Sequence, residues 1–201
     1  ILFGRTAQVN VQGLVASTLD IDDQVYLGGL NSVDGQNPTF AWQDESGLAT
    51  FDHEENYVKV EQGGNITTGS GGRVFLLARQ VENAGTISTP QGQAALVAGD
   101  KVWLKSPDKE AIYASEANKQ IPALRGLLFE VSGEGEARNL GTILTERGNT
   151  TLVGYTVRNE GLIRATTSVT ENGSVLLLAR TGAQYNTSAT PQRVLSTVGG
   201  T

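Results

Sequence analysis

A short block of sequence recurs along this chain, and the recurrence constrains the fold more than any single residue does. The block is Asn-x-Gly-x-Ile, and it begins at Asn83, Asn139 and Asn159, with a variant at Gln62. A glycine-led apolar strand follows each copy. Repeats at short, fixed periods predict stacked units, because a unit of this size cannot bury its apolar side alone.

The glycine-led strands fix the length of the repeat. Two of them start at Gly72 and Gly92, 20 residues apart, and the motif returns at Gly148 and Gly173. Each strand is too short for a helix, so the sequence predicts a coil of strands, which is a β-solenoid. We expect equivalent inward positions on stacked parallel strands for four leucines, namely Leu76, Leu96, Leu152 and Leu177.

Two further expectations follow from the same repeat. Asn83, Asn139 and Asn159 are predicted to occupy equivalent corners, where their amides bond the backbone of the turn. The strands at 74–77 and 175–178 are apolar on both faces, whereas the wall of a coil needs only one apolar face. A hairpin or an insertion is therefore expected to cover the second face.

Composition excludes several classes of protein. The 201 residues include 25 Gly, no Cys and no Met, so no disulfide framework exists, and we expect a mature or trimmed product. The net charge of −6 argues against a nucleic-acid surface. No apolar run approaches the roughly 18 residues of a membrane span, which argues against stable membrane insertion.

We predict a single domain over residues 1–201 with four kinds of segment. Alternating Ala7, Val9 and Val11 lie in a strand-rich N-terminal segment that fits a solenoid cap. Gly85 and Gly141 lie 56 residues apart, which predicts two coils plus an excursion at 105–119. The segments are a cap at 1–21, a loop and hairpin region at 22–61 with strands at 39–42 and 48–51, coils at 62–104 and 138–201, and an insertion with irregular coil at 105–137. Nothing ends the repeat near Thr201, so we expect the front end of a longer protein.

The N-terminal segment resembles the secretion domain of two-partner-secreted exoproteins, the filamentous haemagglutinin and haemolysin family. The similarity begins at Ile1-Leu2-Phe3-Gly4, continues through the stretch from Val9 to Thr18, and extends over essentially the whole chain. The family's Asn-Pro-Asn-Gly element is not in this sequence. The resemblance implies an all-β, right-handed parallel β-helix with an N-terminal β cap and extra-helical hairpin and loop insertions.

The same resemblance implies export through a barrel-type outer-membrane partner transporter, by way of the periplasm, to the bacterial surface or medium. The expected parent is a large adhesin or haemagglutinin, which binds a host-cell or matrix carbohydrate or protein. A haemolysin or a contact-dependent toxin is the alternative parent. The stretch expected to form the cap and the region recognised by the transporter comprises Val9, Asn10, Val11, Gly13, Leu14, Val15, Ala16, Ser17 and Thr18.

The acidic and charged residues offer ligands or catalytic groups for other chemistry. Asp20, Asp22 and Asp23 suggest calcium, but no glycine-punctuated ligand loop surrounds them, so we favour a solvated turn. The single His53 lies in an exposed charged run, which favours no metal site, and the same run offers no context for a triad with Ser17. We expect no cofactor.

A polysaccharide-active β-helix enzyme is the alternative from another class. Such a site needs clustered carboxylates with a basic residue on a shared face. The basic residues are predicted to be scattered without carboxylates at repeat spacing, and the aromatic residues to cover edges of the core rather than stack on sugars. The basic residues concerned are Arg73, Arg79, Lys101, Lys105 and Arg138, and the aromatic ones are Trp42, Tyr57, Trp103, Tyr113 and Tyr155. We therefore predict a protein without enzymatic activity.

Overall fold

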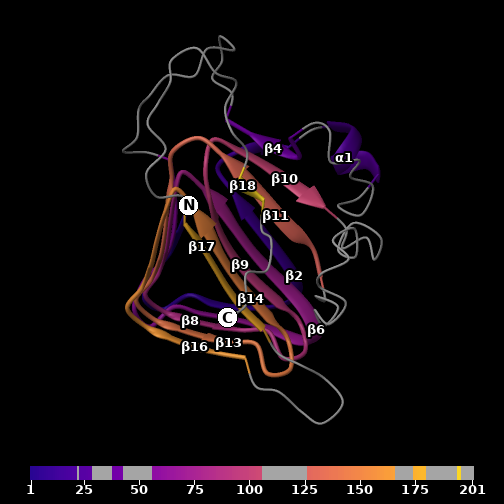
Figure 1. The fold of residues 1–201 in the computed structure, drawn as a ribbon. Helices are drawn as coiled ribbons and strands as arrows, with labels where there is room; N and C mark the ends of the chain where they lie inside the picture. The colour runs from indigo at the N-terminus through magenta and orange to yellow at the C-terminus, as the bar shows by residue number, and fades with distance from the viewer. Residues whose placement is uncertain are drawn as a thin grey trace, which may run out of the picture.

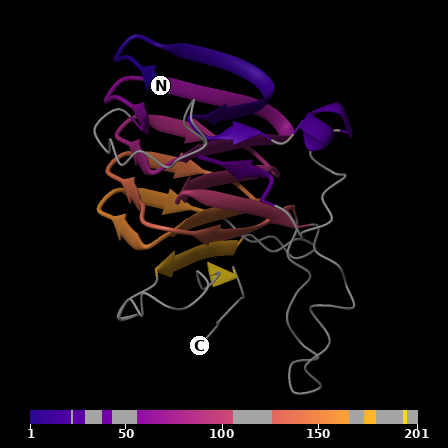
Figure 2. The same cartoon turned by 90° about the horizontal axis from the view of Figure 1, so that it is seen from above.

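The structure is a computed structural model that describes residues 1–21, 23–28, 38–42, 56–105, 126–165, 174–179 and 194–195. These residues form a parallel β-helix, which confirms the predicted β-solenoid. Figure 1 looks along the axis of the coils, and the strands form three walls around an apolar interior. Figure 2 shows the coils stacked from the N-terminal end to the C-terminal end.

The first wall is a parallel sheet to which each coil contributes one short strand. In spatial order these are β1 (Leu2–Phe3), β5 (Tyr57–Val60), β7 (Gln80–Asn83), β12 (Glu136–Asn139) and β15 (Thr156–Asn159). Every neighbouring pair is parallel, as coils that wind in one direction require.

The other two walls are parts of one larger sheet. The second wall contains β8 (Thr86–Ser88), β13 (Thr142–Leu144) and β16 (Leu162–Arg164), and the third contains β9 (Gln93–Ala98), β14 (Asn149–Gly154) and β17 (Ser174–Ala179). Two long strands, β2 (Gln8–Ser17) and β6 (Asn65–Ala78), run along both walls, because β6 pairs with β8 and with β9. These strands join the two walls.

The leucine register predicted from the repeat is confirmed. Leu76 pairs with Leu96, Leu96 with Leu152, and Leu152 with Leu177. The first three are fully buried, and Leu177 is 48% exposed on the last described coil. Each fully buried leucine contributes on the order of 2 kcal/mol through the apolar area it removes from water.

An asparagine ladder runs through the first wall at its junction with the second. Asn139 pairs in register with Asn83 and with Asn159. The amide of Asn83 donates to the Oδ1 of Asn139 at 2.8 Å, and the amide of Asn139 donates to the Oδ1 of Asn159 at 2.8 Å. The equivalent corners are confirmed, but the amides bond mainly one another, with longer contacts of 3.4 Å to the carbonyls of Thr142 and Gly141.

The glycines of the repeated block lie where successive coils approach most closely. A Cβ on Gly141 would lie 2.1 Å from the carbonyl oxygen of Gly85, and one on Gly161 would lie 2.1 Å from that of Gly141. Any side chain would push the coils apart at this corner. The Asn-x-Gly pair of the motif thus combines a hydrogen-bonded ladder with close backbone contact.

An antiparallel sheet covers the outside of the third wall. Its strands in order are β18 (Val194–Leu195), β11 (Leu128–Ser132), β10 (Lys101–Lys105), β4 (Phe40–Ala41) and β3 (Asp20–Ile21), with the short helix α1 (Asp23–Gly28) beside it. Phe75, Leu77 and Val97 point outward into this second core, where the rings of Phe75 and Phe129 meet edge to face at 5.1 Å. The prediction that a hairpin or insertion covers the apolar outer face is confirmed.

Three details differ from the sequence-based expectation. Thr86 pairs directly with Thr142, so one coil rather than two separates Gly85 from Gly141. The chain makes a longer excursion between β9 and β12, and this excursion supplies β10 and β11 to the outer sheet. Val60 rather than Gln62 pairs with Asn83, because two extra residues form a turn before Gly64.

Several sequence-based expectations lie wholly or partly outside the described residues. These are the excursion at 105–119 beyond residue 105, the second strand of the predicted hairpin at 48–51, and most of the predicted coils beyond residue 165. In the predicted hairpin, the first strand, β4, pairs instead with β3 and β10. The segment boundaries proposed for the domain stay a prediction.

Candidate functional site at the N-terminal coil

The stretch from Val9 to Thr18 forms most of the first coil. It lies in β2, and β2 pairs in parallel with β6 from Gln8 to Ser17. Within the described part of the chain β2 has no strand on its other side, so one edge of a ten-residue strand is open. An open edge presents unpaired backbone N–H and C=O groups, to which another strand can add.

Alternate residues of β2 point into the solenoid. Val9 and Leu14 pack against the inner core, and Ala16 is buried in it. Val11 has the same inward parity, since its partner Thr68 is buried, yet it is 37% exposed on this outermost coil. The inward side chains pack the first coil against the core. The outward side chains of β2 do not take part in this packing.

The middle of β2 contains an irregular step. The pairing register shifts between Val11 and Gly13, and the Gln12 amide donates to the Ser70 carbonyl at 3.2 Å across the shift. Asn10 is exposed, and a Cβ built on Gly13 meets nothing within 4 Å. Substitutions at these two positions therefore alter the surface of the coil without crowding its interior.

The end of β2 is anchored by hydrogen bonds. The Thr18 N–H donates to the Leu77 carbonyl at 3.1 Å, and the Thr18 hydroxyl donates to Oδ1 of the buried Asn56. The Ser17 hydroxyl donates to the Leu19 carbonyl at 2.9 Å and accepts from the Leu19 N–H at 3.0 Å. These bonds lie at the point where the chain leaves the coil towards β3.

An apolar hollow of about 470 Å³ lies where β2 leaves the cover of the outer sheet. Val15, which is 41% exposed, lies on one side of it, and α1 lies on the other. Tyr26 and Leu27 of α1 are 71% and 78% exposed. The hollow is lined by Val15, Ser17, Leu19, Ile21, Val25, Tyr26 and Phe40. Exposed apolar surface of this kind is typical of an interaction site.

The prediction of scattered, unmatched basic residues is wrong for two of them. Arg138 lies 3.7 Å from Glu82 and 3.2 Å from Glu160 on neighbouring coils of the first wall. Arg79 is buried, and its Nε lies 2.5 Å from Asp100 where the chain leaves β9. Repeat stacking brought these charges together, although they are distant in sequence.

The structure places the remaining candidate residues in different parts of the molecule. Trp103 is buried in β10 and Trp42 packs against the outer core, whereas Tyr57 is half-buried on the outside of the first wall. Tyr113 lies outside the described residues, as do Asp22 and the run at 52–55. No group of three potential metal ligands occurs among the residues that the structure describes.

The hollow and α1 were not predicted from the sequence. Residues 22–61 are predicted to be a loop and hairpin region, and the Val25-Tyr26-Leu27 run was the available signal for a helix there. An apolar triplet in an acidic segment is unusual for a solvated loop. Its position beside Val15 depends on the return of the chain along the outer sheet, which local sequence does not encode.

The chain was compared with protein-family models, curated protein sequences and solved structures. Neither a protein-family model nor a curated protein sequence matches the chain. Among solved structures, the crystal structure of the HMW1 secretion domain from Haemophilus influenzae matches with a TM-score of 0.61 and 27% identity. The match covers 88% of this chain.

The predicted resemblance to a two-partner secretion domain is confirmed. The chain spans 40% of the length of the HMW1 chain that it matches, so the similarity concerns this domain rather than a whole exoprotein. None of the helices in the described ranges has the length and hydropathy needed to cross a membrane.

Proposed function

We propose that this chain is the secretion module of a large bacterial exoprotein and that it directs export through a barrel-type outer-membrane transporter. The observation that carries the proposal is the similarity to the HMW1 secretion domain over 88% of the chain. The open edge of β2 and the neighbouring hollow supply the surface by which the transporter recognises the module. The residues proposed for recognition are those of the stretch from Val9 to Thr18.

The proposed mechanism is physical rather than chemical. An extended chain crosses the transporter from the periplasm and folds outside, where each coil stacks on the one before it. Stacking buries leucines such as Leu76 and Leu96 and completes the asparagine ladder, so return through the pore requires unfolding. The first coil acts as the template for this process, because β2 pairs along nearly the whole of β6.

The parent protein is proposed to be an adhesin or haemagglutinin that reaches the cell surface or the medium. Its target is proposed to be a host-cell or matrix carbohydrate or protein. The full sequence of the parent protein would distinguish an adhesin from a haemolysin or a contact-dependent toxin.

The experiment that tests the proposal is an export assay with a matched pair of variants. The chain is produced in cells with a partner transporter, and the amounts in the periplasm and the medium are compared. Asn10→Asp combined with Gly13→Val changes the exposed side of β2 and should abolish export, while synthesis and melting temperature stay at the wild-type level. Glu146→Gln, in an exposed turn three coils away, is the control. Wild-type export of the double variant would contradict the recognition role.

A further inference from the structure

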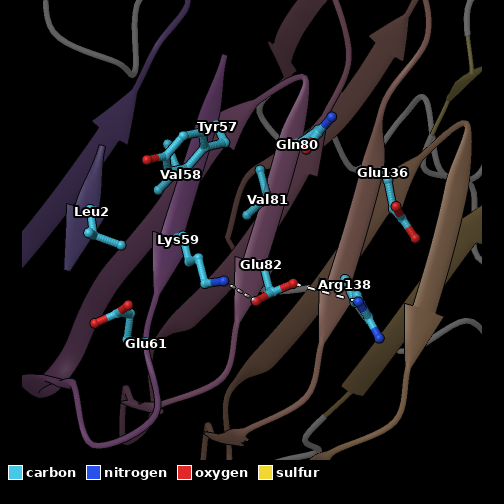
Figure 3. A pocket seen from close by; sticks show the side chains of 10 residues that line it. All are labelled: Leu2, Tyr57, Val58, Lys59, Glu61, Gln80, Val81, Glu82, Glu136 and Arg138. Carbon is cyan, nitrogen blue, oxygen red and sulfur yellow. Dashed lines mark ion pairs between the residues drawn. The ribbon is translucent and has the colours of Figure 1, made fainter. Parts of the chain in front are cut away.

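The outside of the first wall contains a shallow trough that the export function does not use. The trough has a volume of about 460 Å³ and runs across β1, β5, β7 and β12. Figure 3 shows two rows of outward side chains, one with Tyr57, Gln80 and Glu136 and the other with Lys59, Glu82 and Arg138. The row between them points into the core, so backbone forms the floor of the trough.

Register explains why the trough is continuous from coil to coil. Tyr57 pairs with Gln80, and Gln80 with Glu136, while the intervening row of Val58 and Val81 is buried. Each coil advances the trough by about 4.8 Å, the spacing of hydrogen-bonded strands. This advance is close to the length of one sugar residue in an extended 1,4-linked polymer.

The charges beside the trough neutralise one another. Lys59 Nζ lies 3.0 Å from Glu82, whose other oxygen lies 3.7 Å from Arg138. Arg158 lies 3.0 Å from Glu136. Every charged side chain of the two rows thus has a partner of opposite sign, and this favours an uncharged ligand over a polyanion.

The hydrogen-bonding groups that remain suit a ligand rich in hydroxyls. The backbone of the floor is engaged in the parallel ladders of β5, β7 and β12, so a peptide strand finds no main-chain partners there. The side chains that can bond a ligand in the trough carry a phenol, an amide, carboxylates and a guanidinium. A half-buried tyrosine ring beside such groups provides both an apolar face and polar anchors, as ligand sites commonly do.

We propose that this trough binds a neutral, extended 1,4-linked oligosaccharide. The face of Tyr57 stacks on one sugar ring, and Gln80, Glu82 and Arg138 bond hydroxyls of the neighbouring rings. The site lies on a different wall from the open edge and the hollow of the N-terminal coil, so export and sugar binding are separate properties.

The test is a titration of the isotopically labelled chain with cellohexaose and chitohexaose, followed by amide NMR shifts. We expect shifts centred on Tyr57, Gln80 and Glu82, with a dissociation constant of about 1 mM or tighter. Tyr57→Ala should raise that constant about tenfold, Tyr57→Phe should stay close to wild type, and Gln80→Ala should weaken binding without touching the core. Tyr155→Ala removes another tyrosine, 38% exposed and outside the trough, and serves as the matched control.

A separate variant tests whether the ion pairs make the trough selective for uncharged sugars. Glu82→Gln frees Lys59 and leaves Arg138 paired with Glu160 alone, so this variant should gain binding to oligogalacturonate that the wild-type chain lacks. Absence of shifts with both neutral hexamers, shifts confined to other walls, or equal losses in Tyr57→Ala and Tyr155→Ala would each overturn the proposal. Export of Tyr57→Ala should equal that of wild type, so failure of the sugar site leaves the secretion function untouched.

Discussion

Replacing Asn139 by alanine tests how much the asparagine ladder stabilises the stacked coils. The Asn139 side chain is fully buried, accepts from Asn83 and donates to Asn159, both at 2.8 Å. Each bond is worth about 1 kcal/mol net, and the stranded Asn83 amide, which keeps only a 3.4 Å contact to Thr142, adds about 1 kcal/mol more. The expected loss in the free energy of unfolding is therefore about 3 kcal/mol.

Asn159→Ala is the matched comparison, because it removes the end of the same ladder. Asn159 is exposed and accepts one ladder bond, from the amide of Asn139. In Asn159→Ala, water can accept from that amide instead, so the expected loss is about 1 kcal/mol or less. Urea unfolding followed by circular dichroism measures both variants, with coincident fluorescence transitions as the check on two-state behaviour. Equal losses at the two positions, or a loss below about 1 kcal/mol for Asn139→Ala, would refute the ladder as a stabilising feature.

Three further predictions concern the core, the coil corner and the absence of chemistry. Leu152→Asp buries an unpaired charge and should cost about 4 kcal/mol or more, whereas Leu177→Asp, at the same register but 48% exposed, should cost much less in the same urea assay. Gly141→Ala forces a Cβ to within 2.1 Å of a carbonyl oxygen and should lower stability by about 3 kcal/mol, while Gly13→Ala, with open space around its Cβ, should stay near neutral; similar melting temperatures for the two would contradict the close stacking of coils. The purified chain should leave polygalacturonate, alginate and chromogenic esters unchanged, and chelators should not shift its melting temperature; turnover lost on substitution of Asp52, His53 or Asp100 would instead establish an enzyme, and a chelator-dependent shift would point to calcium at Asp20, Asp22 and Asp23.

The repeat predicted the solenoid and its register because both follow from local periodicity. The distances between Gly72, Gly92 and their counterparts set the length of a coil, and the leucines between them then stack without further information. The two-faced strand at 74–77 likewise predicted an outer cover, since apolar side chains on both faces need two layers of neighbours.

The remaining features depend on contacts between residues far apart in sequence. The single coil between Gly85 and Gly141 was missed because the excursion between β9 and β12 has no repeat of its own. Arg138 lies 56 residues from Glu82 in the chain, yet they are neighbours across β7 and β12. The hollow beside α1 has the same origin, because the return of β3 and β4 along the outer sheet creates it.

The central claim is that the transporter recognises the N-terminal coil of this module. Site-specific photo-crosslinking in living cells tests it most directly, with the crosslinker placed at Asn10 on the open side of β2 or at Glu146 in an exposed turn three coils away. The account predicts an adduct with the partner transporter from position 10 and little or none from position 146. Adducts of equal strength from both positions, or an adduct from position 146 alone, would contradict it.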